Sequence, residues 1–370
     1  MDKFRIVVIF GTRPEAIKLW PLIVELRKNV KLDIKVVNSG QHDELMRKIL
    51  KECQIHVDET LSVITANQTL NRLSASILLS VEKSLLNLQP QLVIVQGDTS
   101  TAFYSALVAF HLKIPISHIE AGLRSHNIEH PFPEEFHRCS ISKISKLNFA
   151  PTEVAFNNLV AEGISRSSIF LTGNTGIDAL KSAIEKLELE TQAEDLQEYG
   201  LVTCHRRESS GVRLGILISA IKQFCVRNPD YLIKFTKHLN PEFYSTIQRE
   251  LSGITNVELL EPQSYFSFIR LLKNCTFVVT DSGGIQEEAP YLKKPTLVYR
   301  ELTERIESVN LGVSRFISAD PEDIVREMER AARGEFQFSK NYAPYGDGYA
   351  SIRIQSVIEE FLEGAGHFGR

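Results

Sequence analysis

The fold of this chain is indicated by residues 92–122, which read LVIVQGDTSTAFYSALVAFHLKIPISHIEAG. An apolar run, Leu92–Gln96, leads through a Gly-Asp turn into the helix-period segment Thr101–His111 and then into a second apolar run, Ile114–Ile119. Runs that are continuously apolar, rather than alternating, are typical of strands that are covered on both faces. A helical segment between two such runs predicts a parallel β–α–β unit.

The same pattern recurs along both halves of the chain. The strands predicted in the first half are Arg5–Phe10, Ile34–Asn38, Leu92–Gln96, Ile114–Ile119, Leu147–Ala150 and Ser168–Leu171. Those predicted in the second half are Leu201–Cys204, Tyr231–Phe235, Val257–Leu260, Phe277–Thr280, Thr296–Tyr299 and Arg315–Ile317. Two such series predict an α/β fold with two Rossmann-like, doubly wound parallel-sheet domains that face each other across a cleft.

The length of the chain also favours two domains, because 370 residues exceed what one hydrophobic core usually serves. A helix rich in Lys and Glu, Ile177–Leu189, precedes the polar stretch Glu190–Glu198 and marks the break. We expect an N-terminal domain at 1–175, a C-terminal domain at 176–350 and a final helical segment at 351–370.

Composition narrows the classes of function. The formal net charge of −4 argues against a protein built to hold nucleic acid. The five cysteines are scattered without zinc spacing, which indicates reduced thiols and no metal site. Neither a signal peptide nor a run of about 18 apolar residues is seen, so we expect a cytoplasmic protein without a membrane segment.

In the first half, chemically useful residues follow predicted strands. Gly11 opens a turn with Arg13 and Lys18 at the start of a helix, which suits phosphate, although an ordinary turn would look the same. The dinucleotide fingerprint GxGxxG is absent, which gives an NAD-binding domain little support.

Three acids stand out in this half. Asp98 follows a strand and could be an active-site carboxylate or a helix cap. Glu120 ends an apolar strand, where a buried carboxylate is either tuned for proton transfer or paired with Arg124 or Arg138. Glu134 follows two prolines and is explained equally well as a helix-start acid.

In the second half, His205 with Arg206 and Arg207 follows one strand and could donate a proton or bind phosphate. Another strand is joined to a helix through Ser282, Gly283 and Gly284, whose backbone amides form a cradle for a diphosphate. One turn into that helix, Glu288 could accept hydrogen bonds from ribose hydroxyls.

Together these motifs resemble the non-hydrolysing UDP-N-acetylglucosamine 2-epimerase family over nearly the whole chain. In order, they read GTRPEAIKL, QGDTST, HIEAGLRS, PFPEEFHR, LTGN, CHRRES, TDSGGIQEEAP and TER, followed by YGDGYAS before the last helix. The resemblance implies two Rossmann-like domains arranged as in GT-B glycosyltransferases, with the last helix packed on the N-terminal domain. It also implies a homodimer.

The reaction that the resemblance implies is interconversion of UDP-N-acetylglucosamine and UDP-N-acetylmannosamine without NAD or metal. UDP is eliminated to give 2-acetamidoglucal and then re-added, with the C2 proton returned to the opposite face. By the same resemblance, the acid/base set consists of Asp98, Glu120, Glu134 and His205. The implied substrate contacts are Arg13, Lys18, Gln263, Phe268, Ser282, Gly283, Gly284, Glu288 and Arg305.

Three alternatives stay open. The chain could act on a related UDP-2-acetamido sugar or hydrolyse the intermediate, although Pro14-Glu15 after GTR argues against the hydrolysing type. It could be a GT-B glycosyltransferase, but a transferase needs fewer paired carboxylates. A nucleotide-sugar sensor without catalysis is disfavoured by the intact acids.

The sequence departs from the family pattern at two places. The usual TERPE reads Thr303–Glu307 with Ile306 in place of proline, which predicts a looser loop. A second UDP-N-acetylglucosamine site that activates many bacterial members is lined by a QHRxM-type segment and by an Arg. Here Asp43 and Asn67 occupy the two arginine positions, so attraction for a diphosphate is lost.

We therefore predict that this second site is weakened or altered. Initial rates should rise with UDP-N-acetylglucosamine concentration without the sigmoidal onset of an activated enzyme. A sigmoidal curve that disappears when Gln41 is substituted would contradict the prediction.

Overall fold

The computed structural model describes residues 3–40, 44–61, 63, 68–189, 197–204, 211–236, 241–301, 303, 305–338 and 344–365, with the side chains at 241–244 and 365 excepted. The chain divides into two compact units, one formed by 1–182 with 345–370 and the other by 183–344. The division falls inside helix α7 (Thr175–Glu188), whereas the sequence expectation placed it at residue 175. Each unit is described by itself.

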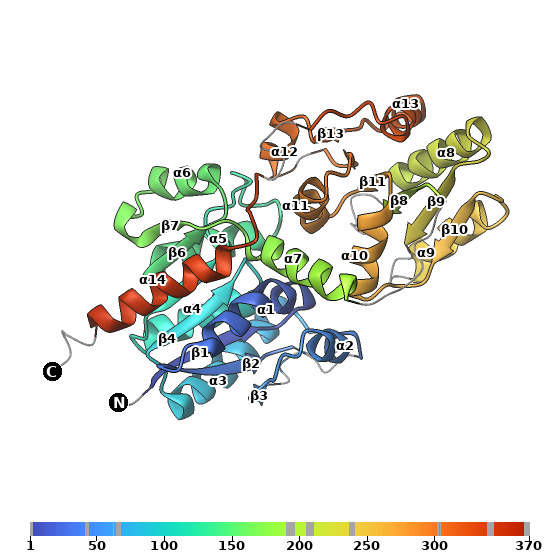
Figure 1. The fold of residues 1–370 in the computed structure, drawn as a ribbon. Helices are drawn as coiled ribbons and strands as arrows, with labels where there is room; N and C mark the ends of the chain where they lie inside the picture. The colour runs from blue at the N-terminus through green and yellow to red at the C-terminus, as the bar shows by residue number, and fades with distance from the viewer. Residues whose placement is uncertain are drawn as a thin grey trace. The chain divides into compact units, whose positions relative to one another are not determined.

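The first unit is built on a parallel sheet of seven strands among its described residues, in the order β3-β2-β1-β4-β5-β6-β7. The strands are β1 (Phe4–Phe10), β2 (Leu32–Asn38), β3 (Glu59–Thr60), β4 (Leu92–Gln96), β5 (Ile116–Ile119), β6 (Leu147–Ala150) and β7 (Ile169–Leu171). Strands β1, β2 and β3 follow one another toward one edge of the sheet, and β4 then pairs with the other side of β1. The strand order therefore reverses between β1 and β4 (Figure 1).

Helices follow these strands and form layers on the sheet. They are α1 (Arg13–Lys28), α2 (Glu44–Glu52), α3 (Leu70–Leu88), α4 (Ser100–His111), α5 (Glu134–Ile144), α6 (Glu153–Ala161), the 3₁₀ turn η1 (Arg166–Ser168), the first part of α7, and α14 (Ala350–Ala365). Helices α3, α4 and α5 pack in succession, while α1 contacts α2 and α14. The last helix of the chain therefore belongs to the first unit (Figure 1).

The second unit repeats this plan, and its described residues form a parallel sheet of six strands in the order β10-β9-β8-β11-β12-β13. Its strands are β8 (Tyr199–Thr203), β9 (Leu232–Thr236), β10 (Val257–Leu260), β11 (Phe277–Thr280), β12 (Thr296–Val298) and β13 (Ser314–Phe316). Its helices are α8 (Val212–Arg227), α9 (Pro241–Leu251), α10 (Tyr265–Asn274), α11 (Gly283–Tyr291), α12 (Ile306–Asn310) and α13 (Pro321–Ala332). Here the strand order reverses between β8 and β11.

The predicted fold class, two doubly wound parallel sheets, is confirmed. Every predicted strand is present, with ends that differ by at most a few residues. The strand β3 was not predicted, because it is two polar residues long and exists only through its pairing with Val37 and Asn38. Among the described residues, we find no helix long and apolar enough to cross a membrane.

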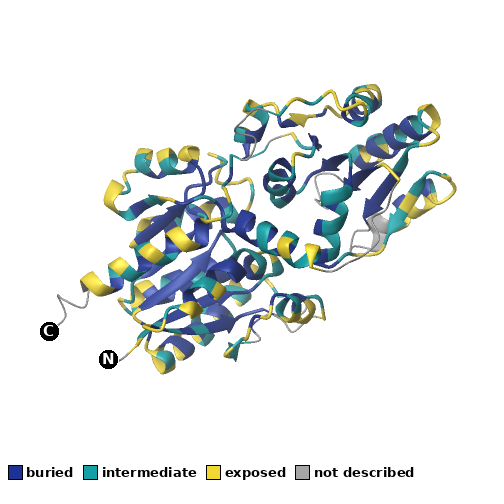
Figure 2. Cartoon of the chain, viewed as in Figure 1, coloured by how far each residue is buried: buried dark blue, intermediate teal, exposed yellow. Residues whose placement is uncertain are grey.

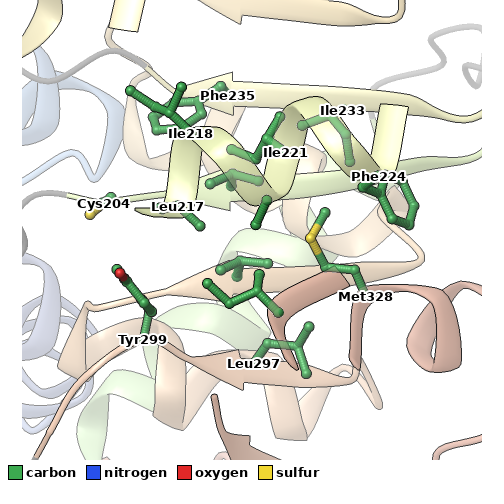
Figure 3. Close-up of a cluster of buried hydrophobic side chains, with 14 of the residues drawn as sticks. Cys204, Leu217, Ile218, Ile221, Phe224, Ile233, Phe235, Leu297, Tyr299 and Met328 are labelled. Atoms are coloured by element: carbon green, nitrogen blue, oxygen red, sulfur yellow. The ribbon is translucent and has the colours of Figure 1, made fainter. Parts of the chain in front are cut away.

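Burial follows the layered plan in both units. The inner strands are buried nearly throughout, the edge strands β3, β7, β10 and β13 are partly exposed, and the helices expose one face to solvent (Figure 2). In the second unit, Leu217, Ile221 and Phe224 of α8 belong to one hydrophobic cluster with Ile233 and Phe235 of β9 and Leu297 of β12 (Figure 3). Continuous apolar strands are thus sandwiched between helices, which is why the sequence pattern is not alternating.

Two glycines of the first unit have left-handed backbones but very different surroundings. Gly122 follows β5 with φ of +91°, and a Cβ there would lie 2.2 Å from the Ala155 carbonyl oxygen. Gly163 follows α6 with φ of +81°, and a Cβ there would meet nothing within 4 Å. At Gly163 only the left-handed backbone favours glycine. At Gly122 the close approach of the turn after β5 to α6 requires glycine as well.

This contrast gives a stability prediction. Gly163→Ala should lower the free energy of unfolding by about 1 kcal/mol, the cost of a left-handed alanine. Gly122→Ala should lower it by about 3 kcal/mol, because overpacking against a backbone carbonyl is added. Urea denaturation followed by the fluorescence of Trp20, the one tryptophan of the chain and buried in α1, reports on this unit. Equal losses in the two variants would contradict the packing argument.

Candidate active site

The predicted site residues of the first unit gather where its strand order reverses. The turn after β1 carries Gly11, and the turn after the adjacent β4 carries Asp98. Glu120 follows β5, the next strand of the sheet. Ligands of open α/β sheets bind beyond the carboxyl ends of strands at such a reversal point. The topology therefore places these residues where a ligand is expected.

Glu15 ties the two central turns together. Its buried carboxylate accepts hydrogen bonds from the backbone N–H groups of Gly11 (3.1 Å) and Thr12 (2.8 Å). It also accepts bonds from the hydroxyls of Thr12 and Thr99, each at 2.7 Å. Burial raises the pKa of Glu15 above its usual value, while these hydrogen bonds act in the opposite direction. Glu15 thus fixes the turn after β1 against the turn after β4.

Glu120 lies in an ion pair with Lys18 of α1, and both side chains are largely buried. The same carboxylate oxygen accepts a hydrogen bond of 3.1 Å from the Asn174 side-chain amide. The backbone of Glu120 is left-handed, with φ of +66°, a conformation that costs a non-glycine residue about 1–3 kcal/mol. Such outliers cluster at functional sites, and this one aims a carboxylate at a lysine and an amide.

The sequence left open a pairing of Glu120 with Arg124 or Arg138, and the structure gives both arginines other carboxylates. Arg124 holds Glu162 with two hydrogen bonds of 2.6 and 2.9 Å. Arg138 pairs with Asp98 and also lies 3.3 Å from Glu135. Lys18, which the resemblance assigned to phosphate, forms an ion pair with Glu120.

Asp98 is held from α5. Besides the ion pair with Arg138, its backbone carbonyl accepts a hydrogen bond of 2.9 Å from Nδ1 of His137, so this nitrogen carries the proton. The His137 ring stacks on Phe103 at a centroid distance of 4.9 Å, and burial lowers the pKa of His137 below its usual value. Asp98 therefore lies between a cation and a neutral imidazole.

Glu135 has a structural role that sequence reasoning did not assign to it. Its buried carboxylate accepts hydrogen bonds of 3.1 Å from the backbone N–H groups of Ser125 and His126. Glu134, its neighbour and the predicted acid, is half-buried at the first position of α5. Arg13 likewise begins α1 and is half-buried.

His118 is fully buried beneath this edge of the sheet. Its Nε2 donates to the Gly97 carbonyl at 2.8 Å, and its Nδ1 lies 3.3 Å from the Ser142 hydroxyl. Burial lowers the pKa of His118 to about 4, so the ring is neutral at neutral pH. It fixes the turn that precedes Asp98 without adding charge.

In the second unit, the turn between β11 and α11 combines a helix N-terminus with an arginine. Ser282 caps α11, and its N–H donates to the Thr280 hydroxyl at 3.0 Å. The Arg305 guanidinium lies against Gly283, where an added Cβ would be only 2.7 Å from it. Its Nε donates to Glu287 at 2.6 Å in a buried pair. Positive charge beside free backbone amides is a chemistry suited to a diphosphate.

The remaining predicted contacts of this unit lie on α10, α11 and the segment before α10. Glu288 of α11 accepts a hydrogen bond of 3.3 Å from the Tyr265 hydroxyl. Gln263, just before α10, donates to the Glu261 carbonyl at 2.6 Å, and Phe268 lies half-buried on α10. Gly284 follows Gly283 in the first turn of α11.

Some predicted residues lie outside the described part of the chain. These are His205 in the catalytic set and Gln41, Asp43 and Asn67 in the predicted second site. Where side chains are described, no three His, Cys, Asp or Glu residues are grouped as a metal site would require.

Three glutamates of the two sites, Glu15, Glu135 and Glu287, were not predicted in the roles that the structure gives them. Glu135 and Glu287 each stand beside a glutamate that was predicted. Neighbours on a helix point about 100° apart, so only packing decides which of the two enters the interior.

Comparison with known proteins identifies the family. A family model described as UDP-N-acetylglucosamine 2-epimerase matches residues 24–359. The UDP-N-acetylglucosamine 2-epimerase of Campylobacter jejuni is 39% identical, over 96% of this chain and 97% of that protein. The enzyme of the same name from Escherichia coli K12 is 37% identical, over 96% and 98%.

Solved structures agree with this. The UDP-GlcNAc 2-epimerase of Neisseria meningitidis, bound to UDP-GlcNAc, matches with a TM-score of 0.90 and 37% identity, covering 97% of this chain and 100% of its own. The Methanocaldococcus jannaschii enzyme, in complex with UDP-GlcNAc and UDP, matches with a TM-score of 0.84 and 32% identity, covering 96% and 100%. Sequence, fold and site residues lead to one conclusion: this chain belongs to the UDP-N-acetylglucosamine 2-epimerase family.

Proposed function

We propose that this protein interconverts UDP-N-acetylglucosamine and UDP-N-acetylmannosamine by eliminating and re-adding UDP. One observation carries the proposal. Asp98 and Glu120 follow the adjacent strands β4 and β5, close to the point where the strand order reverses, and each forms an ion pair with a largely buried cation. The chain that carries these two acids belongs to the epimerase family. Carboxylates at such a position can act as general acids and bases in proton transfer.

The first half of the reaction breaks two bonds of the sugar. A carboxylate takes the proton from C2, and the electron pair left behind forms the C1=C2 double bond. The C1–O bond breaks at the same time and its electrons leave with UDP. The products are 2-acetamidoglucal and UDP, and no electron is gained or lost overall. This step needs a base at C2 and positive charge at the leaving diphosphate.

The second half reverses these events on the other face of the sugar. A phosphate oxygen of UDP attacks C1, and C2 receives a proton from the side opposite to the one it left. Two proton carriers are therefore required. We assign them to the set Asp98, Glu120 and Glu134, with His205 near the diphosphate, and we treat the acids as one coupled group.

We assign binding of UDP to the second unit. The amides of Gly283 and Gly284, the Ser282 hydroxyl and the Arg305 guanidinium supply donors for the diphosphate, and this proposal is supported by the close contact of Arg305 with Gly283. Glu288 is proposed to accept from the ribose, while Gln263 and Phe268 are proposed to hold the uracil. Arg13 and Lys18 of the first unit are proposed to complete the phosphate contacts.

Two further expectations belong to this proposal. The five cysteines are free and four of them are buried, which suits a protein that acts in the reducing cytoplasm. Association into a homodimer stays a prediction from the family resemblance.

The central prediction concerns proton exchange at C2. Incubation with UDP-N-acetylglucosamine in D2O should give UDP-N-acetylmannosamine with deuterium at C2, followed by NMR. Asp98→Asn and Glu120→Gln should each lower the exchange rate by at least about a hundredfold, since each removes a proton carrier. Wild-type exchange in either variant would remove that residue from the mechanism. Release of free N-acetylmannosamine would indicate the hydrolysing reaction, and no exchange without an acceptor would favour a transferase.

A second prediction concerns the diphosphate cradle. Gly283→Ala should weaken UDP binding about tenfold or more, measured by calorimetry, because the added Cβ displaces the Arg305 guanidinium. Gly215→Ala in α8 is a suitable control, because a Cβ there meets nothing within 4 Å. Equal affinities of the two variants for UDP would contradict a role for Arg305 in binding.

A further inference from the structure

The segment Tyr345–Arg353, which contains the YGDGYAS motif, has no role in the mechanism proposed above. It is nevertheless part of the first unit, although the whole second unit, Ala183–Pro344, separates it in sequence from the rest of that unit. Tyr345 is buried, and α14 begins at Ala350 and packs on α1.

The segment is fastened at several points to the residues that follow β7. The Asp178 carboxylate accepts hydrogen bonds from the N–H groups of Ala350 (3.1 Å) and Ser351 (2.7 Å). Arg353 donates to the Thr172 carbonyl at 2.9 Å and pairs with Asp347 of the segment itself. Residues 172–178 and 345–353 therefore form one connected structure.

Asn174 lies at the centre of this structure. Its backbone N–H donates to the Tyr345 carbonyl at 2.7 Å. Gly173 and Gly346 allow the two backbones to approach closely, since a Cβ on Gly346 would lie 3.2 Å from the Asn174 nitrogen. The Asn174 side-chain oxygen accepts from the Gly176 N–H at 2.9 Å, which leaves the amide nitrogen directed at Glu120. Both ends of the amide are thereby oriented.

We propose that Asn174 is a positioning residue for Glu120, and that the segment 345–353 fixes Asn174 in this role. The Asn174 amide bonds the same Glu120 oxygen that Lys18 contacts, so amide and ammonium together set the direction of the carboxylate. The left-handed backbone of Glu120 makes such external support necessary, because the local conformation is unfavourable by itself.

The titration of Glu120 depends on the charged and polar groups beside it. Lys18 faces it from α1, and Asn174 faces it from the turn after β7. His118, two residues earlier on β5, is buried and neutral at neutral pH. Loss of the Asn174 donor should therefore show directly in the titration of the Glu120 carboxyl group.

The experiment uses the full chain labelled with ¹³C-glutamate, and the Glu120→Gln spectrum identifies the Glu120 signal. Asn174→Ala removes the donor to Glu120 without placing a second carboxylate beside it. We expect the midpoint of the Glu120 titration to rise by about one pH unit or more, because a hydrogen bond to the carboxylate is lost. We expect kcat for epimerisation to fall at least about tenfold, with KM nearly unchanged.

Two more variants keep the test decisive. Gly346→Ala places a methyl group against the Asn174 nitrogen and should shift the Glu120 midpoint in the same direction, even if Asn174→Ala fails to fold. Tyr349→Ala is the matched control in the same segment, because the Tyr349 ring contacts Lys181 instead, and it should shift nothing. An unchanged midpoint in folded Asn174→Ala or Gly346→Ala would overturn the proposal.

The consequence for catalysis rests on the proposed function, and the two can fail separately. A shifted midpoint in an enzyme that exchanges no C2 proton would support the positioning role and refute the epimerase reaction. C2 exchange in the wild type with an unchanged midpoint in the variants would do the reverse.

Discussion

The hydrogen bonds of the buried Glu15 carboxylate are the interaction on which the site of the first unit depends. An unsatisfied buried carboxylate is costly, so the amides of Gly11 and Thr12 and the hydroxyls of Thr12 and Thr99 must converge on it. Two of these residues follow β1 and one follows β4. Lys18 lies one turn further along α1, and Asp98 directly precedes Thr99. The same carboxylate therefore also fixes the backbone positions of these two charged residues.

The two units share one topology but carry different charged groups at the point where the strand order reverses. At the reversal point of the first unit, acids are matched with cations, as in the pairs of Lys18 with Glu120 and of Arg138 with Asp98. At that of the second unit, the N-terminus of α11 lies beside the Arg305 guanidinium, which is itself paired with Glu287. The first arrangement suits proton transfer and the second suits an anion. A reaction that moves a proton and expels a diphosphate requires both.

The strands were predictable because strands buried on both faces have continuously apolar sequences. The carboxyl ends of these predicted strands then indicated Asp98, Glu120 and the turn at Ser282 as site residues. Partners were much less predictable. The Lys18–Glu120 pair joins residues 102 positions apart, and no local pattern distinguishes it from the pairing with Arg124 that the sequence left open. The roles of Glu135 and Glu287 were missed for a related reason, since the side of a helix that is buried depends on tertiary packing.

Glu120 shows why such partners matter more than propensity at a functional position. Glycine would adopt φ of +66° without strain, yet a carboxylate occupies this place. The strain is tolerable only if the surroundings hold the residue there, and they do so from three separate parts of the chain: β5, α1 and the turn after β7. The segment that begins at Tyr345 holds the turn after β7 through a backbone hydrogen bond. A residue near the end of the chain thus supports the geometry of an acid encoded in its first third, which explains why the closing segment belongs to the first unit.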